Sequence, residues 1–210
     1  MKKLILSFAL VASVLTACKS EKKDKVAATE AVEVAVVADL NNVDVASSVI
    51  TWKGTKPGGA HDGTIALREG SLNVEAGKLT GGSFIIDMSS IKNLDLDAGG
   101  AAKIVGHLSA PDFFDVATYA TSKFVITSVA EVEGKLAVTG NLTVKDVTKS
   151  ITIPAMLSTI GNVTTFKSEK FNIDRAEFNV KYASKKFFDN LKDKFIDDLI
   201  EFSFTVNTKA

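Results

Sequence analysis

Apolar and polar residues alternate along most of the chain, and this period of two is typical of half-buried β-strands. The alternation is clearest in 135–145, where Leu136 and Val138 share one face and Thr139 lies on the other. Turns that contain glycine separate many of these segments, and one such turn is predicted at Glu69–Gly70 between 61–67 and 71–75. The pattern predicts strands at 49–54, 61–67, 71–75, 79–88, 124–132, 135–145, 151–157, 162–173, 176–180 and 200–206.

Two stretches break the alternation and predict short helices. The residues of 101–108 favour a helix that runs towards Pro111. Pro111 itself fits the first turn of a further short helix, because its missing N–H costs nothing there. In 184–198 the apolar residues recur at helical spacing, as in Phe187 and Leu191, and predict a short amphipathic helix.

About eight short strands joined by tight turns indicate an antiparallel barrel or sandwich, and therefore an all-β fold. A barrel is favoured because the first and last segments, 49–54 and 200–206, can pair and remove the sheet edges. The interior of such a barrel is filled by side chains or holds one small ligand. Pro154 lacks the N–H of a central strand position, which implies an edge or a bulge in 151–157.

The first 47 residues differ in composition from the rest and predict a targeting segment. Lys2 and Lys3 precede an apolar run at 4–14 that is too short to span a bilayer and is typical of a signal peptide. The sequence LTAC at 15–18 resembles a bacterial lipobox, which implies cleavage before Cys18 and lipid on its thiol. The predicted division is a signal peptide at 1–17, a lipidated cysteine with a flexible tether at 18–47, and a folded domain at 48–210.

Composition and charge narrow the class of partner. The chain is 46% hydrophobic and 24% charged, as globular proteins are. Loss of the two leader lysines takes 25 basic residues to 23 against 25 acidic ones, a formal charge of −2 that argues against nucleic acid. Cys18 is the only cysteine, which excludes an internal disulfide. Asp174 and Arg175 are predicted to form a local ion pair at a strand bend, and the oligomeric state is not predicted.

Candidate catalytic and metal-ligating residues are few. His61 and His107 are the only histidines and lie 46 residues apart, without a cysteine or carboxylate at ligand spacing, so structural hydrogen bonds are predicted for them. Asp95 and Asp97 resemble part of a calcium loop, but Ile104 occupies the position of its final glutamate. No Ser/His/Asp set appears in a supporting motif. The expectation is therefore a non-enzyme without a metal or cofactor.

Four segments, taken in order, resemble the YceI-like family of lipid-binding, lipocalin-like proteins. They read HDGTI at 61–65, KIVGHLSAPDFFD at 103–115 with Tyr119 and Phe124 beyond it, GNLTVKDVTKSITIP at 140–154 and FNIDRAEF at 171–178. The resemblance covers about 48–209. Two departures, Ala120 in place of a common proline and Asn179 in place of a common glycine, are local matters of the backbone.

The resemblance implies an antiparallel lipocalin-like β-barrel of about eight strands with short helical crossover segments. It also implies an elongated apolar cavity for a polyisoprenoid chain, such as a quinone or undecaprenyl-type tail, and no catalysis. Phe113 and Phe114 become candidate lids or plugs at one end of the barrel. The predicted ligand-binding residues are Phe84, Ile86, Phe113, Phe114, Phe124, Ile126, Phe171, Phe178, Phe202 and Phe204.

Three function classes stay open at this point. The favoured one is a carrier or sink for an apolar lipid, attached to a membrane of the cell envelope through Cys18. Lys19 stands where an aspartate would retain the protein in the inner membrane, so the outer membrane is favoured. The alternative is a non-catalytic interaction module whose filled barrel binds a protein or glycan partner. An enzyme is the weakest, because no nucleophile, base or metal motif is present.

Overall fold

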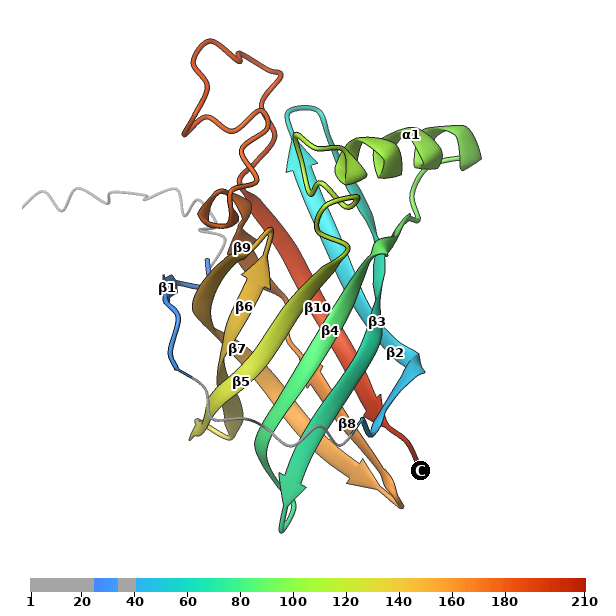
Figure 1. The fold of residues 1–210 in the computed structure, drawn as a ribbon, viewed down its shortest axis with the longest axis vertical. Helices are drawn as coiled ribbons and strands as arrows, with labels where there is room; N and C mark the ends of the chain where they lie inside the picture. Colours follow the sequence, from blue (N-terminus) through green and yellow to red (C-terminus); the bar gives the residue numbers. More distant parts are fainter. Residues whose placement is uncertain (1–24, 34–40) are drawn as a thin grey trace, which may run out of the picture.

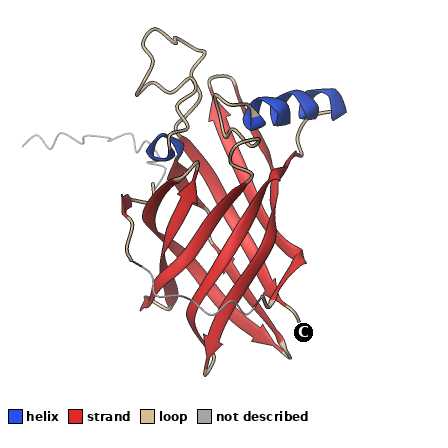
Figure 2. Cartoon of the chain, in the orientation of Figure 1, coloured by secondary structure: helices blue, strands red, loops and turns tan. Residues whose placement is uncertain are grey.

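The computed structural model describes residues 25–33 and 41–210, so the predicted signal peptide and Cys18 lie outside the described residues. Eight antiparallel strands close into a barrel, which confirms the predicted fold class (Figure 1). Helix is confined to one end of the barrel (Figure 2). The barrel strands are β2 (Val43–Lys56), β3 (Gly59–Glu75), β4 (Lys78–Asn93), β5 (Thr121–Val132), β6 (Lys135–Val144), β7 (Val147–Ile160), β8 (Val163–Ser168) and β10 (Leu199–Thr208).

The barrel closes because β10 pairs with both β2 and β8, and β8 in turn pairs with β7. In the β2–β10 ladder Trp52 lies opposite Phe202, and Ile50 lies opposite Phe204. This register confirms the predicted pairing of the first and last barrel segments. Closure satisfies the backbone groups that an open sheet would leave exposed along two edges.

A segment from the amino-terminal region completes the wall between β7 and β9 (Phe171–Asp174). β9 pairs with β10, whereas β8 pairs with the far part of β7. β1 (Ala28–Glu30) pairs with β7 at 149–151, and the N–H of Val26 donates to the carbonyl of Asn172 in β9 (2.9 Å). Both β1 and the start of β2 fall within the interval predicted as a tether, so part of that interval belongs to the barrel wall.

The strands predicted at 61–67 and 71–75 form one continuous strand, β3, and the turn predicted between them is wrong. A register shift next to Glu69 in the β3–β4 ladder absorbs the irregularity as a bulge. Gly70 is buried, and a Cβ built there would lie 3.0 Å from the ring of Phe84. Glycine serves close packing at this position.

The predicted helix at 101–108 is confirmed as α1 (Ala98–Ser109), which lies across one end of the barrel (Figure 1). It begins earlier than expected because Asp97 caps it, with Asp97 Oδ1 accepting a hydrogen bond from the N–H of Gly100 (2.7 Å). We call the end of the barrel next to α1 the mouth. No helix in the described ranges is long and apolar enough to cross a membrane.

The segment after α1 is a compact turn, so the short helix expected to start at Pro111 is wrong. The N–H groups of Phe113 and Asp115 both donate to the carbonyl of Ala110 (2.9 Å each). Asp115 has a positive φ of 49°, which ends any right-handed helical path. The turn folds the two phenylalanines back towards the barrel.

The helix predicted at 184–198 is also wrong. Residues 181–198 form a loop of tight turns that projects beyond the mouth (Figure 1). Ala183, Asn190 and Lys192 have φ values of 49°, 61° and 50°, which a right-handed helix excludes. Helical spacing of apolar residues did not decide the conformation here, because the loop is held by tertiary hydrogen bonds described below.

The strand predicted at 176–180 is replaced by a 3₁₀ helix, η1 (Arg175–Phe178). Asp174 caps it, and Asp174 Oδ1 accepts from the N–H of Ala176 (3.0 Å). Asn179 ends it in the left-handed region at φ 62°. Asparagine tolerates that conformation, which explains how it can stand where relatives of this type have glycine.

Gly63 provides a test of the barrel packing. A Cβ at Gly63 would lie 1.8 Å from the carbonyl oxygen of Lys92 and 2.7 Å from the ring of Trp52, so backbone would have to move. We expect Gly63→Ala to lower the free energy of unfolding by about 3 kcal/mol, measured by chemical denaturation. Gly54→Ala is the matched control, since nothing lies within 4 Å of its Cβ position. Equal stability of the two variants would contradict the close packing of Gly63 against Lys92 and Trp52.

Candidate ligand-binding site

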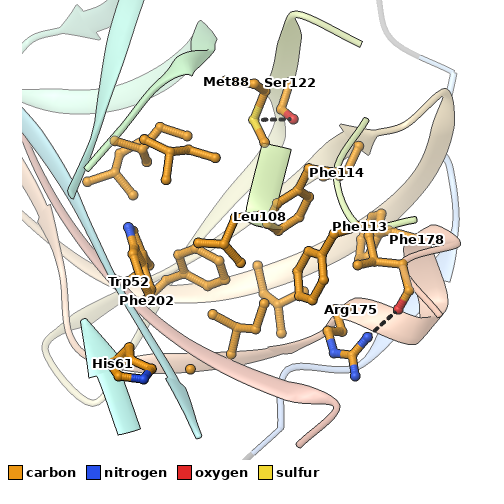
Figure 3. A pocket seen from close by; sticks show the side chains of 18 of the residues that line it. Trp52, His61, Met88, Leu108, Phe113, Phe114, Ser122, Arg175, Phe178 and Phe202 are labelled. Atoms are coloured by element: carbon orange, nitrogen blue, oxygen red, sulfur yellow. Dashed lines mark hydrogen bonds between the residues drawn. The ribbon is translucent and has the colours of Figure 1, made fainter. Parts of the chain in front are cut away.

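A cavity of about 840 Å³ occupies the barrel interior and opens towards the mouth (Figure 3). This volume lies within the range of small-molecule sites. Apolar side chains from the barrel strands line most of its length, with α1 and the 181–198 loop contributing at the mouth. The polar and charged residues of the lining are Thr55, Lys56, His61, Lys103, His107, Ser122, Arg175, Tyr182, Asp193 and Lys194.

Aromatic packing builds the inner part of the cavity. The ring of Phe166 lies 4.9 Å from that of Phe204 and 6.1 Å from that of Phe84, measured between centroids. Phe171 stands 6.2 Å from Phe202 in the same way. Paired rings of this kind resist collapse, because each is buttressed by its neighbours. The cavity therefore has a firm apolar wall.

Nine of the ten predicted ligand-binding residues line this cavity. The exception is Ile126, which is buried in the larger core cluster and is absent from the lining. Ile126 is therefore a core residue, and alternation along a strand does not separate core residues from lining residues. Whether the nine contact a ligand stays a prediction; they are Phe84, Ile86, Phe113, Phe114, Phe124, Phe171, Phe178, Phe202 and Phe204.

Several lining residues were missed by sequence reasoning. Trp52 and Phe166 alternate with polar neighbours in β2 and β8, so their positions carried a usable signal. Trp52 is buried, and its Nε1 has no hydrogen-bond partner among the described residues. Trp52 therefore lines the cavity with the apolar part of its ring, while Nε1 is covered by protein atoms.

Phe113 and Phe114 meet at the mouth but differ in burial (Figure 3). Phe113 is 2% exposed, and its ring lies within 5.4 Å of the ring of His107 and beneath Arg175, whose Cζ is 5.3 Å away. Phe114 is half-buried and packs against a smaller core cluster that contains Trp52. Phe113 is therefore a structural plug, while Phe114 lies at the opening.

Arg175 is the buried charge that shapes the mouth, and the ion pair predicted between it and Asp174 is wrong. Its guanidinium donates to three backbone carbonyls: Nη1 to Val180 (2.7 Å), Nη2 to Ile196 (3.0 Å) and Nε to Asp197 (3.2 Å). Burial lowers the pKa of Arg175 despite nearby carboxylates. The carbonyls lie on both ends of the 181–198 loop, so one side chain fastens the loop to the barrel.

Asp174 joins the base of the same loop to the amino-terminal segment. Its Oδ2 accepts from Lys25 Nζ (2.8 Å) and also from Lys186 Nζ. Burial by itself raises the pKa of Asp174, but the hydrogen bonds from Lys186, Lys25 and the N–H of Ala176 outweigh it and lower the pKa. The carboxylate is therefore ionised at neutral pH and bridges the two lysines.

The structural hydrogen bond predicted for the histidines is confirmed for His61, whereas the side chain of His107 makes ring contacts. His61 Nδ1 lies 2.9 Å from Asp95 Oδ2, and this hydrogen bond is the main cause that lowers the pKa of Asp95 to about 2. His107 packs edge-on against Tyr182, with ring centroids 4.7 Å apart. Across 25–33 and 41–210, no group of three or more His, Cys, Asp or Glu side chains is arranged to hold a metal ion.

A closed antiparallel barrel with a deep apolar cavity and a polar mouth defines a class of binding proteins whose interior supports the binding of apolar lipids. The chain belongs to the YceI-like domain family, whose model matches residues 22–208. This confirms the family predicted from the four sequence segments.

Comparison with known proteins agrees with this assignment. The chain is 32% identical over 134 residues to the UPF0312 protein of Pseudomonas fluorescens (strain SBW25), a match that covers 63% of the chain and 65% of that relative. The chain thus matches just under two thirds of the length of that relative.

Two solved structures share the fold. BcnA of Burkholderia cenocepacia has a TM-score of 0.64 at 24% identity, over 80% of this chain and all of that one. A polyisoprenoid binding domain from Saccharophagus degradans, implicated in plant cell wall breakdown, has a TM-score of 0.62 at 15% identity, over 80% and 97% of the two chains.

Proposed function

We propose that this chain binds a polyisoprenoid or related apolar lipid, such as a quinone-like or undecaprenyl-type tail, in the barrel cavity as a carrier or sink. The observation that carries the proposal is the open apolar cavity of about 840 Å³, lined by paired phenylalanines. Each Å² of apolar tail that leaves water contributes roughly 25 cal/mol before the costs of binding are deducted. The name of the Saccharophagus domain supports the same ligand class.

The lining also suggests which part of the lipid enters first. The inner cavity is apolar, whereas lysines, histidines and Tyr182 gather at the mouth. A polar head group would therefore remain at the mouth while the tail fills the barrel.

The proposed role is non-catalytic. At the mouth, Arg175 and His61 are held in structural contacts, and among the described lining residues no hydrogen bond joins a nucleophile to a base. The alternative of a filled barrel that acts only as an interaction module is weakened by the open cavity. Lipidation of Cys18 would anchor the protein to a membrane of the cell envelope, with the outer membrane favoured by Lys19.

Extraction of bound lipid tests the proposal. We expect the Cys18→Ser protein, purified from a bacterial envelope fraction, to release an apolar lipid into organic solvent, identified by mass spectrometry. Substitution of Cys18 removes covalent lipid, so that any lipid recovered comes from the cavity. Protein that is folded but consistently empty would overturn the cavity proposal.

Ile86→Trp should block the cavity. Ile86 lines it from β4, whereas the adjacent Ile85 does not, because successive strand residues face opposite sides. We expect Ile86→Trp to reduce the extracted lipid per protein by about tenfold, since the indole occupies space that the tail needs. Ile85→Trp is the matched control and should retain wild-type lipid. Equal lipid in both variants would place the ligand elsewhere.

A further inference from the structure

We propose that the 181–198 loop docks the mouth of the barrel on an anionic phospholipid bilayer, with Phe187 and Phe188 inserted among the lipid head groups. The loop projects past the barrel at the end where the cavity opens (Figure 1). Four properties of the loop support this surface and this partner: exposed aromatic residues, local positive charge, contact with the cavity, and closeness to the amino-terminal segment.

Two adjacent aromatic rings are held out in solvent. Phe187 is 46% exposed and Phe188 is 48% exposed. Their N–H groups both donate to the carbonyl of Ser184 (3.1 and 3.0 Å), and Ser184 itself is fully buried. At the other end of the loop, Arg175 donates a hydrogen bond to the carbonyl of Ile196 and holds the backbone there. The backbone is thus fixed while the two rings have no core to enter, which is typical of an interaction surface.

The charge around these rings fits an anionic surface. The whole 181–198 loop contains five lysines and four aspartates, a formal charge of +1. Two of the aspartates, Asp197 and Asp198, lie at the base of the loop against Arg175, so residues 181–196 beyond the base carry a formal charge of +3. Lys181 Nζ lies 5.0 Å from the centroid of the Phe187 ring, so cation and aromatic are presented together. Lysine stems beside inserted aromatic rings are the arrangement found in interfacial membrane segments. The lysines are Lys181, Lys185, Lys186, Lys192 and Lys194.

The loop is continuous with the cavity. Tyr182, Lys194 and Ile196 line the cavity at the mouth, only a few residues from the exposed rings. Insertion of Phe187 and Phe188 would therefore bring the opening to the bilayer surface. A lipid tail could then pass between bilayer and barrel without exposing its full apolar area to water, which is the main cost of transfer.

The amino-terminal segment enters the fold beside the same loop. Lys25 and Lys186 bind the same oxygen of Asp174, so the first described residue lies at the base of the loop. Cys18 precedes Lys25 by seven residues, which span at most about 25 Å when fully extended. This step rests on the proposed lipid anchor: an anchored Cys18 holds the loop, rather than the opposite end of the barrel, near the bilayer.

Depth-dependent fluorescence quenching tests the docking. Full-length protein with Trp52→Phe would carry one introduced tryptophan, by Phe188→Trp or by Ile160→Trp. Ile160 is the matched control because it is 84% exposed in the β7–β8 turn, away from the mouth. With vesicles of phosphatidylcholine and phosphatidylglycerol that carry brominated acyl chains, Phe188→Trp emission should shift to the blue and be quenched, while Ile160→Trp emission stays unchanged.

A charge variant probes the electrostatic part. Lys192→Gln should weaken binding of the Cys18→Ser protein to the same vesicles about fivefold and leave binding to pure phosphatidylcholine unchanged. Lys78→Gln, in the β3–β4 turn, is the control and should have no effect.

Three outcomes would overturn the docking: emission from position 188 that vesicles leave unchanged, equal quenching at positions 188 and 160, or a blue shift at position 188 that grows with protein concentration without vesicles. The last outcome would assign the loop to contact with a second copy. If lipid is extracted but the tryptophan at position 188 stays in water, the cavity proposal holds and the docking proposal fails. If the tryptophan at position 188 is quenched but no lipid is extracted from the cavity, the docking proposal holds and the cavity proposal fails.

Discussion

Arg175→Met is expected to lower the free energy of unfolding by about 3–5 kcal/mol, because it leaves one buried and two partly buried backbone carbonyls without their donor and removes the ion partner of Asp198. The side chain is 2% exposed and binds the carbonyls of Val180, Ile196 and Asp197. Methionine keeps much of the volume, so the loss reports the hydrogen bonds and the charge rather than a large void. Chemical denaturation gives the energy, and thermal melting should fall by roughly 10 °C.

Arg68→Met is the matched control, since Arg68 is exposed on β3 and the chain has no other arginine. Its stability should stay within about 0.5 kcal/mol of wild type. A loss below about 1 kcal/mol in Arg175→Met would contradict the role of Arg175 in holding the 181–198 loop. It would also weaken the docking proposal, because that proposal needs the loop to be fixed.

Phe113→Ala is expected to destabilise the protein by about 3–5 kcal/mol, whereas Phe114→Ala should cost about 1 kcal/mol and mainly reduce lipid retention. Phe113 is enclosed by His107, Tyr182 and Arg175, so truncation leaves a cavity that its neighbours cannot fill. Phe114 is half-buried at the opening of the cavity, where truncation widens the mouth. Denaturation curves and extracted lipid per protein separate the two effects.

Each of these phenylalanine variants serves as the control for the other, since the two residues are adjacent and chemically identical. Equal losses of stability would show that Phe114 is also core. Retention of lipid in Phe114→Ala at the wild-type level would assign the opening to other residues, such as Leu108 from α1 or Tyr182 from the loop.

The local sequence pattern predicted most of the barrel, because each strand has one face towards the barrel interior and one towards solvent, and the alternation of residue types reflects these two faces. Lys135 to Val144 has one face towards the interior and one towards solvent, so its residue types report the fold directly. The helix before Pro111 was predictable for a similar reason, since Asp97 and Pro111 flank a segment without strand alternation. Six of the nine predicted residues that line the cavity lie on strands, whereas Phe113, Phe114 and Phe178 lie outside them and were predicted from the family resemblance.

The errors lie where tertiary contacts outweigh local preference. Apolar spacing in 184–198 suits a helix, yet Arg175 and Ser184 bind the backbone of this loop in another path. Gly70 looks like a turn residue but is needed for packing on Phe84. Asp174 and Arg175 are neighbours of opposite charge, yet Asp174 binds Lys25 and Arg175 binds the carbonyl of Ile196, both far along the chain. None of these partners can be identified from sequence spacing.

The sequence by itself determined the strands, the pairing of the first and last barrel segments, the family, and the supply of phenylalanine for an apolar interior. Those features depend on residue type and period, which are local. Only the tertiary structure decided that the barrel encloses an open cavity, that Phe113 is a plug while Phe114 lies at the opening, and that the 181–198 loop presents Phe187 and Phe188 to solvent. Alternation separates the two faces of a strand without showing which face is inside. Whether a cavity remains depends on how the side chains of all eight strands pack together.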